Sequence, residues 1–286
     1  IREDPLDKVF DDISEHLTPE MQATFEKQIQ ELHRKEDELV RQCPEEDRAF
    51  LSDILSIEIP DPTTTENAEA VVQDKLQKFL STHKRALLRH GFFSAEDLKL
   101  LFVKVDVKDF FERLNEKAEN SRNPFLKIMQ LKGALFLTLA GCAEVLDNAA
   151  ENSEYPPLTN EGSAALSDHL HFLKEVSGIT ALGADMKYLH SMINRVPPKN
   201  FTEKVMEIVS HAMLAFMRAI AHIRFDWKVS AKAHEDENDT PALNTGRRTV
   251  VHQSRHATGD TPAEDDSSAH GFHNAATRLK EQMKRN

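Results

Sequence analysis

The stretch from Gly133 to Leu146, GALFLTLAGCAEVL, constrains the fold most, because its first eleven residues carry no charge. A membrane-spanning helix needs about 20 consecutive apolar residues. Lys132 and Glu144 bound the uncharged run, so it reaches only about half of that length. We therefore predict no transmembrane span here, and a helix buried at the centre of a helical core instead.

The distribution of side chains around this helix supports the same prediction. The helix should begin after Asn123–Pro124 and run for about 25 residues. Its small residues, Gly133, Ala140 and Gly141, lie near one side, where they would let a neighbouring helix approach closely. The opposite side carries the larger apolar residues, which are Ile128, Leu131, Leu135, Leu139, Cys142 and Leu146. A helix that is apolar nearly all round is normally buried.

Helix start and stop signals recur along the rest of the chain. Thr18–Pro19 can begin one helix and Pro44 another, Gly91 can end one, and Ser94 precedes two acids. Asn200 with Glu203 resembles a capping box for a last long helix. The spacings predict helices at about 5–17, 19–42, 44–55, 66–90, from 94, 107–114, from 124, 163–177, 181–195 and 201–230.

Composition points to the same fold class. The chain has 9 glycines, whereas average usage would give about 20 at this length. Alternating runs of β-branched and aromatic residues are absent, so strand signals are poor. We predict an all-α protein, a multi-helix bundle of eight to ten helices with an extended polar C-terminal tail.

Two loop-like stretches and one change of composition divide the chain. Residues 57–67 contain two prolines and a threonine run, and residues 152–162 form a second proline-rich stretch. We expect residues 1–57 to form an N-terminal helical hairpin or arm and residues 66–232 the main bundle. Residues 233–286 are polar and poor in apolar side chains, which predicts an extended or disordered tail with a short helix at its end.

Net charge and the number of cysteines limit the binding partners and the cellular compartment that we expect for the protein. The net charge of −12 does not attract nucleic acid or anionic lipid through the overall field. Cys43 and Cys142 form neither a disulfide framework nor a zinc pattern, which favours reduced thiols in a soluble, intracellular protein. The first residue is Ile1, and removal of a mitochondrial targeting peptide or cloning of a fragment would explain that start.

Histidines and carboxylates at helical spacing are the candidate metal ligands in this sequence. Asp168, His171 and Glu175 could share one helix face, and these three are the candidate metal ligands. Glu207 and His211 lie one turn apart on another helix, with His222 three turns further on. Such spacings are also common on solvated faces, because residues four apart pair with each other. We therefore expect no resident metal and no cofactor.

Basic residues supply the candidates for binding a partner, namely Lys84, Arg85, Arg89, Arg247 and Arg248. The alternative reading of the first three is a solvated helix face. His83, between the apolar positions Phe79 and Leu87, is expected to be a buried histidine with its hydrogen bonds satisfied. Cys142 is expected to be inert packing.

Catalytic motifs with a serine elbow, a phosphate-binding glycine loop or a zinc-binding His-Glu-x-x-His are absent from the sequence. We therefore expect a non-catalytic helical scaffold or adaptor subunit whose partners are other protein subunits. One alternative is a coat-like nucleoprotein that binds nucleic acid through a local basic groove. A second alternative is a small-molecule-binding protein or enzyme with a cavity between helices, lined by methionines such as Met206 and Met213.

Overall fold

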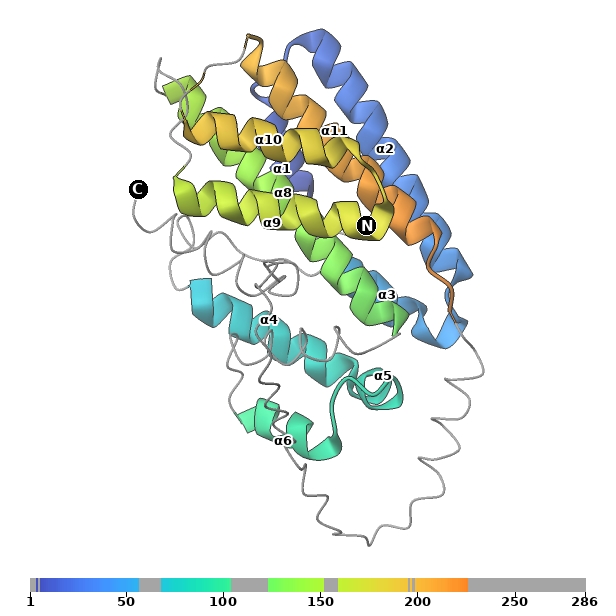
Figure 1. Cartoon of the computed structure of the whole chain (residues 1–286). Helices are drawn as coiled ribbons and strands as arrows, with labels where there is room; N and C mark the ends of the chain where they lie inside the picture. Colours follow the sequence, from blue (N-terminus) through green and yellow to red (C-terminus); the bar gives the residue numbers. More distant parts are fainter. Residues whose placement is uncertain are drawn as a thin grey trace, which may run out of the picture.

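The computed structural model describes residues 4, 6–56, 68–103, 123–151, 159–194, 196 and 199–225. Ten α-helices and one short 3₁₀ helix account for most of these residues, and no strand occurs among them. The predicted all-α bundle is therefore confirmed (Figure 1). The helices are α1 (Leu6–Ser14), α2 (Pro19–Gln42), η1 (Glu45–Asp47), α3 (Arg48–Leu55), α4 (Ala68–Thr82), α5 (Lys84–Arg89), α6 (Ala95–Val103), α8 (Pro124–Glu151), α9 (Asn160–Ser177), α10 (Ala181–Ile193) and α11 (Phe201–Ala221).

Helix α8 is the central helix of the bundle, as its sequence predicts. It packs against α1, α3, α9 and α11. Among the described helices, α8 is the one long and apolar enough to cross a membrane, but 72% of its most apolar 18-residue window is buried inside the protein. Its composition is thus that of a core helix, which is hydrophobic on all sides because other helices cover it on all sides.

The small-residue side of α8 permits the close approach that the sequence predicts. A Cβ atom added at Gly141 would lie only 2.5 Å from Cδ2 of Leu166 on α9. Leu166 is itself buried, so it has little space into which it could move. Gly141 therefore sets how closely α8 and α9 pack.

The first three helices contribute to the same core as the rest of the bundle. Helix α2 lies alongside α11, and α1 and α3 pack on α8 (Figure 1). Gln28 of α2 and Ser210 of α11 form a hydrogen bond of 3.0 Å. Phe25 and Leu32 of α2 belong to one continuous cluster of buried apolar side chains with Phe216 of α11. The division of the chain at residue 57 stays a prediction.

Several predicted helix ends carry the expected capping contacts. The Thr18 hydroxyl accepts a hydrogen bond from the Met21 amide, and Pro19 is the first residue of α2. Ser94 and Asp97 exchange backbone-to-side-chain hydrogen bonds at the start of α6. Gly91 has φ of +68°, the left-handed conformation that glycine adopts without steric cost.

Two predicted helix boundaries are wrong. The helix expected over 66–90 is divided into α4 and α5 at His83, whose backbone leaves the helical region while its imidazole contacts Asp53. The helix expected over 201–230 ends at Ala221, whose carbonyl accepts a hydrogen bond from the Arg224 side chain. Phe225 then packs against Phe125, with 5.3 Å between the ring centroids.

The predicted capping box at Asn200 is also wrong. Asn200 has φ of +61°, and its side chain makes no capping hydrogen bond to α11. Asparagine is one of the few residues that tolerate this left-handed conformation, so the residue serves the turn instead of the cap. Its backbone carbonyl accepts the hydrogen bond from the Lys204 amide at 3.1 Å.

Some of the predictions concern segments outside the described residues. These are the loop at 57–67, the helix at 107–114, most of the loop at 152–162 and the tail at 233–286, including Arg247 and Arg248.

Candidate functional site

The first group of buried charges, called here the Lys132 cluster, consists of Asp4, Glu36 and Lys132. The three residues are 6%, 0% and 4% exposed, respectively. Lys132 lies in the first third of α8, and its Nζ lies 3.0 Å from Asp4 Oδ2 and 2.9 Å from Glu36 Oε1. Glu36 belongs to α2, and Asp4 lies two residues before the start of α1, where its Oδ1 accepts a hydrogen bond from the Leu6 amide. The cluster therefore ties three helices together.

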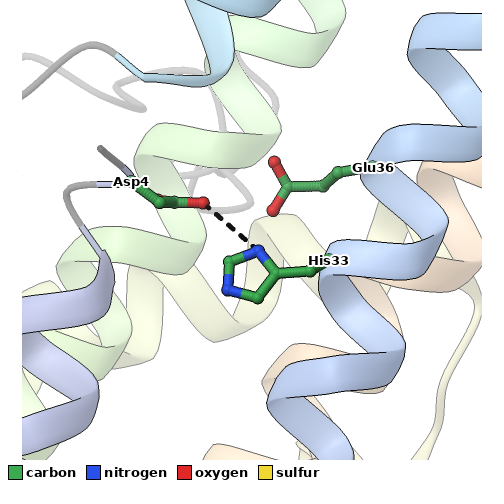
Figure 2. Close-up of side chains that lie close together, drawn as sticks. All are labelled: Asp4, His33 and Glu36. Atoms are coloured by element: carbon green, nitrogen blue, oxygen red, sulfur yellow. Dashed lines mark ion pairs between the residues drawn. The ribbon is translucent and has the colours of Figure 1, made fainter. Parts of the chain in front are cut away.

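The carboxylates of this cluster also form a group that could hold a metal ion. Among the described residues, Asp4, His33 and Glu36 have ligand atoms that all lie within 4.8 Å of one another. Figure 2 shows these three side chains, with His33 Nδ1 3.8 Å from Asp4 Oδ2. The Lys132 ammonium already contacts both carboxylates, so a metal ion would have to share them with a second cation. The contacts of Asp4 and Glu36 with Lys132 therefore fit a buried ion pair better than a metal centre.

The metal ligands proposed from the sequence are arranged differently. His171 Nε2 lies 3.8 Å from Glu175 Oε1 on α9, and the two side chains are 39% and 61% exposed. Within the part of the chain that the structure describes, Asp168, His171 and Glu175 do not gather into a group of ligand atoms within 4.8 Å. These three residues share helical spacing on α9, and among the described residues no ligand from a second helix joins them within that distance.

A second group of buried charges, called here the Asp47 cluster, consists of Asp47, Arg89 and His90. Asp47 is fully buried, and its Oδ1 accepts hydrogen bonds from Arg89 Nη2 and from His90 Nε2, the latter at 3.0 Å. Asp47 Oδ2 and Arg89 Nε are buried without a hydrogen-bond partner. The cluster joins η1 to the end of α5.

Burial keeps His90 neutral. Removal of the ring from water, and then the nearby charge of Arg89, lower the pKa of His90 to about 4. A neutral imidazole can still donate from Nε2, so the hydrogen bond to Asp47 does not require protonation. His90 stacks on Phe50 and lies 4.5 Å, centroid to centroid, from Phe125. These apolar surroundings are the cause of the low pKa.

His83 is the buried, satisfied histidine that its position on an apolar face predicts. It is buried, its Nε2 is hydrogen bonded to Asp53 Oδ2, and its ring packs against Phe50 and Phe79. The contact links the junction of α4 and α5 to α3. It also accounts for the irregular backbone at this position, because the imidazole reaches across to a neighbouring helix.

The basic residues proposed to bind a partner do not share one environment. Lys84 and Arg85 are exposed on α5. Arg89 points inward, with its side chain only 11% exposed and its guanidinium paired with Asp47 and, at 3.7 Å, with Glu46. Arg89 is therefore occupied by a contact with η1, and Lys84 and Arg85 lie at the surface.

Both cysteines are buried free thiols. Burial raises the pKa of Cys43 and of Cys142 to about 12. A thiol reacts and binds metals as the thiolate, so neither residue is activated.

A third buried polar contact joins α10 to α11. Asp185 is fully buried, and its Oδ2 lies 2.9 Å from Nδ1 of His211, whose side chain is 31% exposed. Burial raises the pKa of Asp185, and Asp185 Oδ1 is buried without a hydrogen-bond partner. Sequence analysis singled out His211 but not Asp185, although Asp185 interrupts the apolar face formed by Leu182 and Leu189.

Comparison with protein-family models, with curated proteins and with solved structures finds no match to this chain.

Proposed function

We propose that this chain is a non-catalytic helical scaffold or adaptor subunit of a larger multiprotein assembly. The observation that supports the proposal is that the buried titratable side chains of this chain form contacts between helices. The Lys132 cluster joins α1, α2 and α8, the Asp47 cluster joins η1 to α5, and Asp185 with His211 joins α10 to α11. Each group holds one helix against another.

Catalytic groups need a matched pKa and access to a substrate. In this chain the two cysteines are protonated and buried. Burial lowers the pKa of His169 to about 4, and that residue is only 3% exposed. These perturbed groups are explained by packing, which supports a structural role.

The surface around Lys84 and Arg85 is the proposed contact for a partner. Residues 68–103 contain six Lys and Arg against four Asp and Glu, and all six except Arg89 are exposed, in a chain whose net charge is −12. Helices α4, α5 and α6 lie together on the far side of α3 from α11 (Figure 1). An exposed basic surface fits an acidic segment of another protein, because complementary charge favours encounter and fixes register.

The experiment that tests this function is the native mass of the untagged protein, released gently from its own source, with absorbance at 260 and 280 nm. We expect a protein-only assembly much larger than 32.5 kDa, and its other chains would identify the process. A lone particle near 32.5 kDa would overturn the proposal. An absorbance spectrum typical of nucleic acid would replace it with the coat-like nucleoprotein.

Charge reversal then locates the contact. The double variant Lys84→Glu/Arg85→Glu should release the chain from its assembly at physiological salt. The matched control is Lys187→Glu/Lys199→Glu, which makes the same change of charge at two other exposed positions. Equal release by both variants would show that net charge, and not this surface, governs assembly.

A further inference from the structure

In the helices that the structure describes, two pairs of glutamate and histidine lie four residues apart, and they differ in what lies behind the histidine. His171 and Glu175 on α9 lie 3.8 Å apart, the histidine half-buried and the glutamate exposed. Glu207 and His211 occupy the equivalent spacing on α11. Only the second histidine is held by a buried carboxylate from another helix, through the 2.9 Å contact between His211 Nδ1 and Asp185 Oδ2.

We propose that His211 and Glu207 form a binding site for a divalent transition-metal ion such as Zn²⁺, with Asp185 orienting His211. Imidazole nitrogen and carboxylate oxygen are ligands that zinc accepts, and side chains four residues apart on a helix can reach the same ion. Histidines that bind metals almost always donate their other ring N–H to a carboxylate or carbonyl. Asp185 supplies that contact and leaves Nε2 as the ligand atom.

The electrostatics around Asp185 favour a cation at this place. Asp185 is fully buried, and one of its oxygens has no hydrogen-bond partner. A metal ion on the far nitrogen of His211 would place positive charge one imidazole ring away from this buried carboxylate.

Glu207 can be recruited at small cost. Its carboxylate lies 2.6 Å from Lys204 Nζ, and the Glu207 side chain is 54% exposed. Ion pairs at such exposed positions contribute little to stability, so exchange of the ammonium for a metal ion is accessible. Two protein ligands leave the remaining coordination positions to water or to a group from another molecule. The proposal does not depend on the scaffold function.

Isothermal titration of the metal-free full chain with Zn²⁺ tests the site by comparison of variants. Five histidines follow residue 225 and would bind zinc alike in every variant, so differences between variants carry the result. We expect His211→Ala to abolish the tightest binding event. The matched control His171→Ala, which breaks the pair without a buried carboxylate, should leave that event within about twofold of wild type.

Two further variants separate the ligand from the residue that orients it. Asp185→Asn should weaken zinc binding by about 10- to 100-fold, the usual effect of losing a partner of a metal-bound histidine. Because that variant could also fail to fold, Glu207→Gln at an exposed position provides an independent loss of one ligand. In the nitrogen-15 spectrum of wild type, zinc should shift Nε2 of His211 more than Nδ1. Equal zinc binding by wild type and His211→Ala would overturn the proposal.

Discussion

The Lys132 cluster and the Asp47 cluster are both buried, but they pair their charges to different extents. In the first, one ammonium contacts two carboxylates, within 3.0 Å of each. In the second, two donors share Oδ1 of a single carboxylate, while Asp47 Oδ2 and Arg89 Nε have no partner. Burial alone therefore does not determine how much stability is lost when the cation of a buried cluster is removed. That loss also depends on how many carboxylates are left without a positive partner.

The largest expected effect comes from Lys132→Met, which leaves two buried carboxylates with no cation between them. Breaking a buried ion pair by removing one partner costs about 3–5 kcal/mol of stability. Urea denaturation monitored by circular dichroism measures the change. The double variant Lys132→Met/Glu36→Gln should regain part of the loss, and failure to regain any would show that the lost packing, and not the carboxylates, is responsible.

Arg89→Met should have a smaller effect, about 2–3 kcal/mol, because Asp47 keeps the hydrogen bond from His90 and only one carboxylate loses its cation. The same denaturation experiment applies. Arg85→Met on the same helix is the control, and it should change stability by less than about 0.5 kcal/mol because Arg85 is exposed. Similar losses in both variants would mean that Arg89 matters through helix propensity alone.

Acid should weaken the Asp47 cluster before it protonates most carboxylates. The pKa of His90 falls to about 4 in the folded protein from 6.5, so the stability that its neutral form contributes is complete above pH 6.5 and is lost as the pH falls toward 4. Between pH 7 and pH 5 we expect His90 to account for a loss of about 1–2 kcal/mol. His90→Gln should flatten the dependence of the denaturation midpoint on pH. If the denaturation midpoint of His90→Gln changed with pH as steeply as that of wild type, His90 would not be the cause of the acid sensitivity.

The smallest effect is expected from Arg34→Ala, which removes an ion pair that water already surrounds. Arg34 forms contacts of 2.6–2.8 Å with Glu31 on the surface of α2, at least as short as those of Lys132. We expect no measurable change in the denaturation midpoint, because solvent screens exposed pairs. A shift comparable to that of Lys132→Met would show that distance, and not burial, determines the worth of a charge pair here.

Local signals in the sequence were sufficient to predict most of the fold. Pro19, Gly91 and Pro124 each act on their own backbone, through a missing amide or a left-handed conformation, so the helix ends beside them follow from the sequence. The break at His83 and the end of α11 at Ala221 depend instead on contacts with Asp53 and Arg224. Such contacts override propensity, and they become visible only in three dimensions.

The buried charged residues are visible in the sequence as charges within apolar helix faces, but helix spacing alone does not identify their partners. Glu36 falls on the same face of α2 as Leu32 and Leu39, and Lys132 lies in a helix that is otherwise apolar nearly all round. A charge in an apolar stripe predicts a buried partner, because an unpaired buried charge is too costly to keep. Which residue provides the partner was not predictable, since Asp4 and Lys132 lie 128 positions apart.

The pairing of α2 with α11 also has a consequence for synthesis of the chain. Gln28 and Ser210 are separated by 182 residues, so α2 leaves the ribosome long before the helix that covers it. At about 5–20 residues per second, the interval is roughly 10–40 s. During that time Phe25, Leu32 and Leu39 have no α11 to pack against. The nascent chain therefore presents an apolar helix that a chaperone can hold, and folding of the bundle finishes only after its last helix has been made.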